Sequence, residues 1–299
     1  MEPVLESLRS GARLAVLRLR SLGDAVLTTP ALALLKQARP DLRLAVVIEG
    51  RFRSVFEGNP DLHAILPPSL AALRAFHPDL CLNLHGGARS ALLAALSGAP
   101  CRAGFAHFRY RPIYNLRIPR AQEILGVDRK VHTAEHLASA VFHLGAPRAE
   151  IPRARLYADP PPFRRPYAVI HPAASHSTKT WPAYRFLELA AQLRDLEPIF
   201  IGGPADDLAA FSGYRTFVAA PLSQVKSLLS GAALFVGNDS GPAHMAAAFG
   251  LPTVVLFAAS DPEIWGPWRT PAQVLSAPSI DAITVDEVLA AAARLGVAA

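Results

Sequence analysis

A polar turn between two apolar segments carries the densest group of residues that could bind an anion. Asn238-Asp239-Ser240-Gly241-Pro242-Ala243-His244 follows one apolar run and opens another. A strand–turn–helix of this kind presents free backbone N–H groups and the positive end of a helix dipole at Ser240 and Gly241. His244 follows about one turn later. The turn predicts a phosphate cradle; the alternative is an ordinary helix cap by Asp239 or Ser240.

Two further polar loops could supply charge to a reaction. Residues 171–182 carry Ser175 and Lys179, and only four of the chain's 30 cations are lysines. A lysine on a loop after a strand suits a phosphate as a point charge, although a solvated lysine would look the same. Asp24 follows Ser21-Leu22-Gly23 at the head of a helical run. An ionised carboxylate there could take a proton from an acceptor hydroxyl, or it could simply cap the helix.

Several catalytic motifs are missing from the sequence. It contains no G-x-G-x-x-G, no P-loop, no G-x-S-x-G elbow, no Cys/His cluster and no D-x-D pair. These absences disfavour dinucleotide cofactors, P-loop NTPases, elbow hydrolases and zinc sites. Cys81 and Cys101 cannot make a disulfide framework.

Alternating elements must position these loops. We expect strands at Arg13–Leu19 and Leu42–Ile48 around a helix at 25–38, another strand near 79–84, and long arginine-rich loops over 98–130. The alternation restarts with a strand at 167–171, includes a strand at 253–257 and continues to a final helix at 284–295. This pattern is typical of α/β units with parallel sheets.

The chain is long enough for two domains. Its 299 residues are 51% hydrophobic, and a typical domain has roughly 150 residues. The proline-rich stretch at 159–162 predicts a boundary that gives domains 1–159 and 160–299, with the last helix a candidate to pack back on the first. Ligands of open parallel sheets bind at the carboxyl edges of the strands, so we expect a cleft between two such edges.

The positive charge is concentrated in the first half. Residues 1–160 hold 21 Lys and Arg against 13 Asp and Glu, and the rest hold 9 against 11. An arginine-rich composition explains part of this, but the asymmetry favours an anionic partner for the first domain. No aromatic platform or RNA module accompanies it, so we expect no nucleic-acid binding. No run reaches the ~18 apolar residues of a spanning helix, which together with the acidic start predicts a cytosolic protein.

Three motifs together resemble glycosyltransferase family nine, the heptosyltransferases of lipopolysaccharide core assembly. They are Arg20–Asp24 with Thr28–Leu32, Lys179-Thr180-Trp181-Pro182, and Asn238–His244, and they occur in the family's order and spacing over residues 13 to about 262. The resemblance implies a GT-B fold, with two Rossmann-like domains facing across a cleft. The first would hold the acceptor and the second the nucleotide sugar.

The resemblance also implies roles for individual residues. Asp24 matches the general base, and Ser21 and Gly23 match the loop beside it. The donor-binding positions would be Ser175, Lys179, Leu222, Asp239, Ser240, Gly241 and His244. An acidic residue after the Gly-Gly strand end is matched loosely by Asp206 or Asp207. The exposed arginines Arg109, Arg111, Arg117 and Arg120 are candidates for the anionic acceptor.

The implied activity is an inverting, metal-independent transfer of a sugar, typically heptose from ADP-heptose, to a lipopolysaccharide core or related glycan. No cofactor is expected. The implied protein is a monomer in the cytoplasm, in peripheral contact with the inner membrane and an anionic glycolipid. A GT-B nucleotide-sugar epimerase and a non-catalytic nucleotide-sugar-binding protein remain the alternatives.

Overall fold

The computed structural model describes residues 3–161, 163 and 165–297, in two compact units, 1–152 and 153–299. The sequence-based boundary after residue 159 falls a few residues later, in a proline-rich stretch whose Pro162 lies outside the described residues. Within the described part of the chain, none of the helices combines the length and apolar character needed to cross a membrane.

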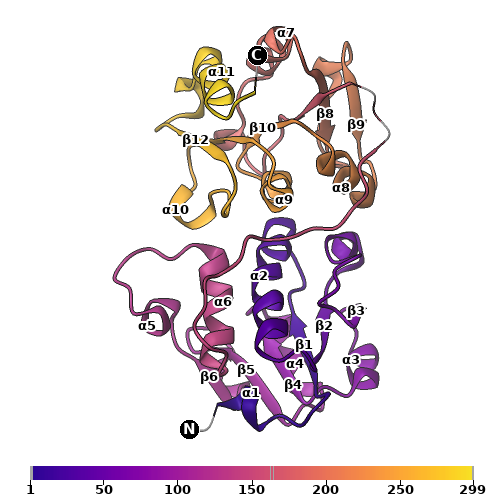
Figure 1. The fold of residues 1–299 in the computed structure, drawn as a ribbon, viewed down its shortest axis with the longest axis vertical. Coiled ribbons are helices and arrows are strands. Elements are labelled where there is room, and N and C mark those ends of the chain that lie inside the picture. Colours follow the sequence, from indigo (N-terminus) through magenta and orange to yellow (C-terminus); the bar gives the residue numbers. More distant parts are fainter. Residues whose placement is uncertain (1–2, 162, 164, 298–299) are drawn as a thin grey trace. The chain divides into compact units, whose positions relative to one another are not determined.

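The first unit is built on a six-stranded parallel sheet (Figure 1). Its strand order is β3-β2-β1-β4-β5-β6, which departs from the order in the chain because helices carry the chain from strand to strand. The strands are β1 (Arg13–Leu17), β2 (Arg43–Val47), β3 (Ala64–Leu66), β4 (Leu80–Asn83), β5 (Cys101–Phe105) and β6 (Leu116–Ile118).

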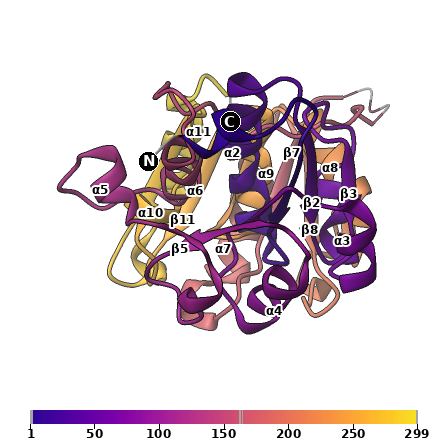
Figure 2. The same cartoon turned by 90° about the horizontal axis from the view of Figure 1, so that it is seen from below.

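Helices cover both faces of this sheet. They are α1 (Val4–Ser7), α2 (Leu22–Ala38), α3 (Leu70–Phe76), α4 (Ala88–Leu96), α5 (Ala121–Leu125) and α6 (Thr133–His143), with 3₁₀ turns η1 (Gly50–Val55) and η2 (Arg111–Ile113). Figure 2 shows α2 and α6 on one side of the sheet and α4 on the other. Successive residues of a strand face opposite sides. Ala15 and Leu17 therefore pack with Leu73 and Leu93 of α3 and α4, and the residues between them face the opposite layer.

The expectation of long loops over residues 98–130 is wrong. This segment holds β5, η2, β6 and α5. Gly104 sits inside β5 because an added Cβ would lie 2.7 Å from the Tyr114 ring, so only glycine lets that ring pack there. Glycine in a strand and a three-residue edge strand both weaken the sequence pattern.

The second unit repeats the architecture. Its parallel sheet has the order β12-β11-β10-β7-β8-β9. The strands are β7 (Tyr167–His171), β8 (Glu197–Gly202), β9 (Arg215–Val218), β10 (Leu234–Asn238), β11 (Thr253–Phe257) and β12 (Ala272–Ser276). The expected strands at 167–171 and 253–257 match, and the short edge strands β9 and β12 were not expected.

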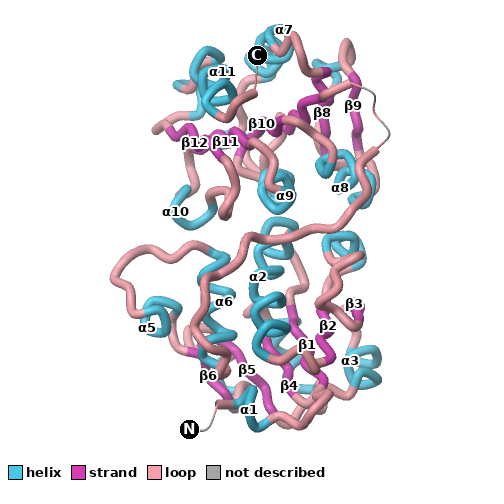
Figure 3. The backbone as a smooth tube through the Cα atoms, in the orientation of Figure 1, coloured by secondary structure: helices cyan, strands magenta, loops and turns pink. Residues whose placement is uncertain are grey.

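The helices of the second unit also form two layers (Figure 3). They are α7 (Ala183–Gln192), α8 (Leu222–Ser230), α9 (Gly241–Phe249), α10 (Pro262–Trp265) and α11 (Val285–Arg294), with 3₁₀ turns η3 (Ser177–Lys179), η4 (Ala209–Phe211) and η5 (Ile280–Ala282). The last helix, α11, packs on α7 and β11 of its own unit, burying Val288 and Ala291 with Phe186 of α7. Its return to the first domain stays a prediction.

Trp181 joins three parts of the second unit. Its backbone N–H donates to Asn238 Oδ1 at 3.1 Å, and its indole Nε1 donates to the carbonyl of Ile283 at 2.8 Å. The side chain is fully buried against Phe186. The loop after β7 is therefore fastened both to the end of β10 and to the segment that leads into α11.

Candidate functional site

In the first unit, the predicted acceptor-side residues lie where β1 ends and α2 begins. Ser21 is the N-cap of α2, and Gly23 and Asp24 lie in its first turn. The Ser21 hydroxyl donates to Asp24 Oδ2 at 3.1 Å, so it orients the carboxylate instead of capping the backbone. Asp24 keeps 23% of its side chain exposed. A partly exposed, oriented carboxylate has the position that a general base needs.

Arg18 is the ionic partner of Asp24. Its Nη1 lies 3.5 Å from Asp24 Oδ1, and the side chain is 7% exposed. Its Nε is buried without a hydrogen-bond partner among the described residues. Burial lowers the pKa of Arg18, and Asp24 opposes that shift. Arg18 lies within the predicted strand Arg13–Leu19, and nothing in the sequence indicated a function for it.

Three histidines that were not predicted belong to this part of the first unit: Asp24 acts electrostatically on His85 and His136, and the His107 ring centroid lies 5.5 Å from that of His136. Because the strands are parallel, His85 after β4 and His107 after β5 lie at the same edge as Asp24. Burial lowers the pKa of His85, and Arg18 and Arg20 lower it further. His136 of α6 stacks on Phe105, with ring centroids 4.1 Å apart. Burial lowers its pKa to about 4, with a contribution from His107. These rings are therefore uncharged at neutral pH.

The four candidate arginines of the first unit are exposed but do not form one group. Arg109 and Arg111 lie before and in η2, which packs against α4. Arg117 lies in the edge strand β6, and Arg120 is the N-cap of α5. Arg120 is close enough to His107 to lower its pKa. Only Arg120 is thus connected to the surroundings of Asp24.

In the second unit, the two donor-side loops meet through an ion pair. Lys179, the last residue of η3, places its Nζ 3.1 Å from Asp239 Oδ2. The same carboxylate oxygen accepts a hydrogen bond from Ser260, which follows β11. The side chain of Asn238 donates to the carbonyl of Pro172 at 2.9 Å and so connects the same two loops a second time. Asp239 therefore holds the lysine in place instead of capping a helix.

Ser240 is the N-cap residue of α9, yet its side chain is turned away from that helix. In the part of the chain that the structure describes, it accepts no hydrogen bond from the first turn. Its Oγ lies instead 3.1 Å from Nδ1 of His171, at the end of β7. The hydroxyl leaves the first-turn amides of Gly241 and Ala243 to another acceptor. Of the two readings of this turn, the geometry favours anion binding over a side-chain cap.

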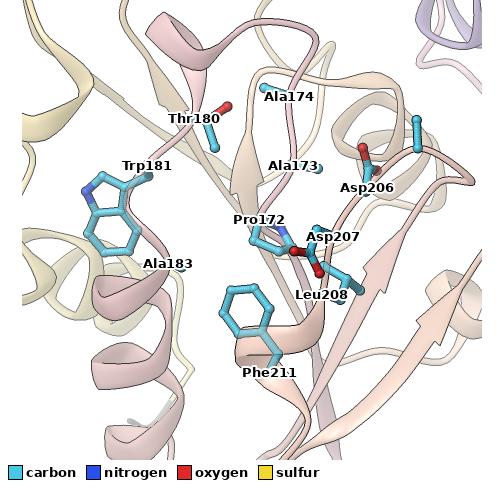
Figure 4. Close-up of a pocket in the computed structure, with 11 residues that line it drawn as sticks. Pro172, Ala173, Ala174, Thr180, Trp181, Ala183, Asp206, Asp207, Leu208 and Phe211 are labelled. Atoms are coloured by element: carbon cyan, nitrogen blue, oxygen red, sulfur yellow. The ribbon is translucent and has the colours of Figure 1, made fainter.

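Asp206 joins the same neighbourhood from the end of β8. Its Oδ2 accepts the backbone N–H of Gly203 at 2.7 Å and lies 4.0 Å from His171 Nε2. Asp206 also lines a pocket of about 250 Å³ between the loops after β7 and β8. Figure 4 shows Asp206 and Asp207 on one side of this pocket and Thr180 and Trp181 on the other.

The remaining predicted donor residues are less tightly connected. Ser175 is exposed in the loop before η3. Leu222 is the first residue of α8, which packs against α9. His244 is buried in α9. Among the described residues, no group of three or more His, Cys, Asp or Glu side chains is arranged to hold a metal ion.

The fold and these sites define a class of protein. Two parallel α/β units with polar loops at their strand ends are the GT-B architecture of sugar-nucleotide glycosyltransferases. The model of glycosyltransferase family 9 (heptosyltransferase) matches residues 70–288, so the chain belongs to this family and is a glycosyltransferase. The match includes Lys179 and the turn at 238–244. The matched region begins after Asp24, so the assignment of a role to Asp24 depends on the geometry of its side chain and on the motif around it.

Individual relatives agree with this assignment. Lipopolysaccharide heptosyltransferase 3 of Escherichia coli K12 is 28% identical over 284 residues, covering 82% of each chain. The structure of E. coli ADP-heptose lps heptosyltransferase II superposes with a TM-score of 0.80 at 20% identity, covering 95% of this chain and 98% of that one. E. coli heptosyltransferase WaaC with ADP gives a TM-score of 0.79 at 21% identity, covering 95% and 99%. At these identities the two structures show a shared fold.

Proposed function

We propose that this chain transfers a heptose from ADP-heptose to an anionic lipopolysaccharide-core acceptor, with inversion at the sugar carbon. The observation that carries the proposal is the donor turn, where Lys179 is held by Asp239 and the first turn of α9 is free of a side-chain cap. Negative charge grows on the departing diphosphate, and a fixed cation and aligned amides stabilise it. The names of the relatives support heptose as the sugar and lipopolysaccharide as the acceptor.

The first unit would supply the base. Asp24, oriented by Ser21 and neighboured by Arg18, would remove the proton of the acceptor hydroxyl as it attacks the sugar carbon. One displacement without a covalent intermediate inverts the configuration, which needs one carboxylate base and no protein nucleophile. Arg120, which is close enough to His107 to lower its pKa, adds a positive charge there and favours an acceptor that carries carboxylate or phosphate groups.

A radiolabelled ADP-heptose assay tests the transfer. Incubation with and without a Kdo–lipid A acceptor should give label in the glycolipid only when the acceptor is present. Release of an epimerised sugar nucleotide without acceptor would identify an epimerase instead. Tight binding of ADP-heptose with no turnover under any condition would identify a non-catalytic binding protein.

We propose further that the reaction needs no divalent metal. Lys179 and the amides of α9 would provide the positive charge that Mg²⁺ supplies in other glycosyltransferases. Full activity is expected after dialysis against excess EDTA. Loss of activity with the chelator and its recovery with Mg²⁺ or iron would overturn this part of the proposal.

We propose peripheral contact with the cytoplasmic face of the inner membrane, by a monomer, through a surface formed by α3, α4 and η2. Leu92 and Leu96 of α4 are 60% and 42% exposed. Arg74, Arg89 and Arg111 flank them, and α3, α4 and η2 contain no acidic residue. Exposed leucines among arginines suit the interface of an anionic bilayer. This surface is called the α4 surface below.

A further inference from the structure

The ends of three neighbouring strands of the second unit place a carboxylate, an imidazole and a hydroxyl next to one another in a row. Asp206 follows β8, His171 ends β7 and Ser240 follows β10, and these strands are adjacent in the order β10-β7-β8. Asp206 Oδ2 lies 4.0 Å from His171 Nε2, and His171 Nδ1 lies 3.1 Å from Ser240 Oγ.

The backbone holds this row in place. Gly237 of β10 pairs with His171 of β7. A Cβ at position 237 would lie 2.9 Å from the His171 carbonyl oxygen and 3.2 Å from its Cβ, so the close approach of the two strands requires glycine. Asp206 is fixed from the other side by the N–H of Gly203. His171 is 7% exposed and has little freedom to turn.

Resting on the proposed function, we propose that Asp206 and His171 are positioning residues that make Ser240 a hydrogen-bond acceptor toward the donor substrate. A carboxylate facing Nε2 favours the tautomer that carries its proton on Nε2. Nδ1 then holds a lone pair and can only accept, so the Ser240 hydroxyl must donate inward to it. Ser240 Oγ presents only lone pairs to a ligand and recognises a hydroxyl group of the nucleotide sugar.

This orientation of the Ser240 hydroxyl means that different groups of the site bind different parts of the nucleotide sugar. Lone pairs on Ser240 Oγ repel the oxygens of a diphosphate, which are left to Lys179 and the backbone amides of α9. Burial lowers the pKa of His171 to about 4, and Asp206 opposes the shift. The ring is therefore neutral at working pH, as a tautomer-dependent arrangement requires.

A Ser-His-Asp line also occurs in hydrolases, where the histidine removes the serine proton as a general base. A nearly buried ring whose pKa is about 4 is a weak base for that purpose at neutral pH. A fluorophosphonate probe distinguishes the two roles, since covalent labelling of Ser240 would contradict a purely orienting arrangement.

The tautomer can be read directly in the ligand-free protein. Nitrogen-15 NMR of histidine-labelled protein, with His171→Gln used to assign the signal, should show His171 protonated on Nε2 only. Asp206→Asn should shift the ring toward a mixture of tautomers. Asp207→Asn, the adjacent carboxylate, should leave the His171 signal unchanged. A wild-type ring protonated on Nδ1 would overturn the proposal whether or not the chain transfers heptose.

The ligand side is tested with Ser240→Ala and two probes. Inorganic pyrophosphate has no hydroxyl groups, so its dissociation constant should stay within about twofold of wild type. ADP-heptose should bind about two- to twelvefold more weakly, the size expected for one neutral hydrogen bond. Lys179→Ala should weaken both probes and serves as the comparison. An equal loss of pyrophosphate and ADP-heptose affinity in Ser240→Ala would show that the hydroxyl binds phosphate.

Discussion

At the residue scale, Asp24 combines a chemical role with a structural one. It lies beside a nearly buried arginine, so removing the carboxylate also removes the counter-charge of Arg18. A buried charge without its partner destabilises a fold. Alanine and asparagine both remove this counter-charge, but asparagine keeps the shape of the side chain and an oxygen that can accept the hydrogen bond from Ser21.

We expect Asp24→Asn to lower turnover by ~10²–10⁴, the usual effect of losing a general base. ADP affinity should stay within a few-fold, because Asp24 belongs to the first unit and the donor residues belong to the second. A steady-state turnover assay and calorimetry with ADP measure the two quantities. More than about a tenth of wild-type turnover in a folded Asp24→Asn protein would remove Asp24 from the mechanism.

Lys179→Ala should weaken ADP binding about 10- to 150-fold, corresponding to ~1.5–3 kcal/mol for a charged hydrogen bond, and turnover should fall with it. Part of this loss comes from Asp239, whose carboxylate would face the diphosphate without its cation. The double variant Lys179→Ala/Asp239→Asn should therefore bind ADP more tightly than Lys179→Ala alone. An unchanged dissociation constant in the single variant would make Lys179 an ordinary surface cation.

At the element scale, the α4 surface separates two arginine pairs that the sequence treats alike. Arg109 and Arg111 adjoin η2 and α4, whereas Arg117 and Arg120 lie on β6 and α5. Replacing Arg109 and Arg111 with glutamine should weaken binding to phosphatidylglycerol-containing vesicles about thirtyfold, from ~1 kcal/mol per arginine. Leu92→Ser/Leu96→Ser should weaken it as well, and the arginine effect should disappear at high salt.

The Arg117→Gln/Arg120→Gln pair is the matched control for charge. It should leave vesicle binding intact and raise the acceptor KM, because Arg120 lies near the histidines around Asp24. In Leu92→Trp, the new indole should be quenched by brominated lipids. Vesicle binding that is equal in both arginine pairs, or an indole in Leu92→Trp that brominated lipids leave unquenched, would place the lipid contact elsewhere.

The elements with strong periodicity could be predicted from the sequence, and those set by tertiary contacts could not. Strands β7 and β11 matched because both are buried runs of apolar residues with clear ends. Strand β5 was missed because its glycine is explained only by Tyr114, ten residues later. Edge strands such as β6 and β9 are short and half-exposed, which leaves little pattern to detect.

The candidate site divides in the same way. Lys179, Asp239 and Ser240 could be found because their motifs are local. His85, His136 and His171 could not, since the groups that face each of them come from distant segments of the chain. Arg18 could not, because its place in a predicted strand does not show that its side chain pairs with Asp24. His171 is 69 residues from Ser240 along the chain. A histidine at the end of a predicted strand was the available signal, since neighbouring parallel strands end at one edge.

At the scale of the whole molecule, the buried His171 and the half-buried His136 connect stability to pH. The pKa values of His136 and His171 are lowered to about 4, one in each unit. Unfolding returns each ring to an ordinary value near ~6.5, so the unfolded chain binds more protons between those limits. The free energy of unfolding should therefore fall as the pH drops from about 6.5 to about 4, by at most ~3 kcal/mol per ring.

Urea unfolding at several pH values measures this dependence. His136→Phe keeps a ring to stack on Phe105 but cannot take up a proton, so its stability should change less with pH than that of the wild type. His63→Gln, at an exposed position, is the control and should follow the wild type. A wild-type stability that is flat across this window would contradict the lowered pKa values of both rings.

The burial and hydrogen bonding of Trp181 have a consequence for the fluorescence of the protein. The chain's three tryptophans, Trp181, Trp265 and Trp268, all belong to the second unit. Trp181 is sealed among apolar side chains with its indole N–H bonded to a carbonyl, so its emission should lie at short wavelength and move to the red when the second unit opens. Tryptophan fluorescence, excited selectively over tyrosine, therefore reports on the second unit alone. Circular dichroism sees the helices of both units, and any difference between the two transition curves measures how independently the units unfold.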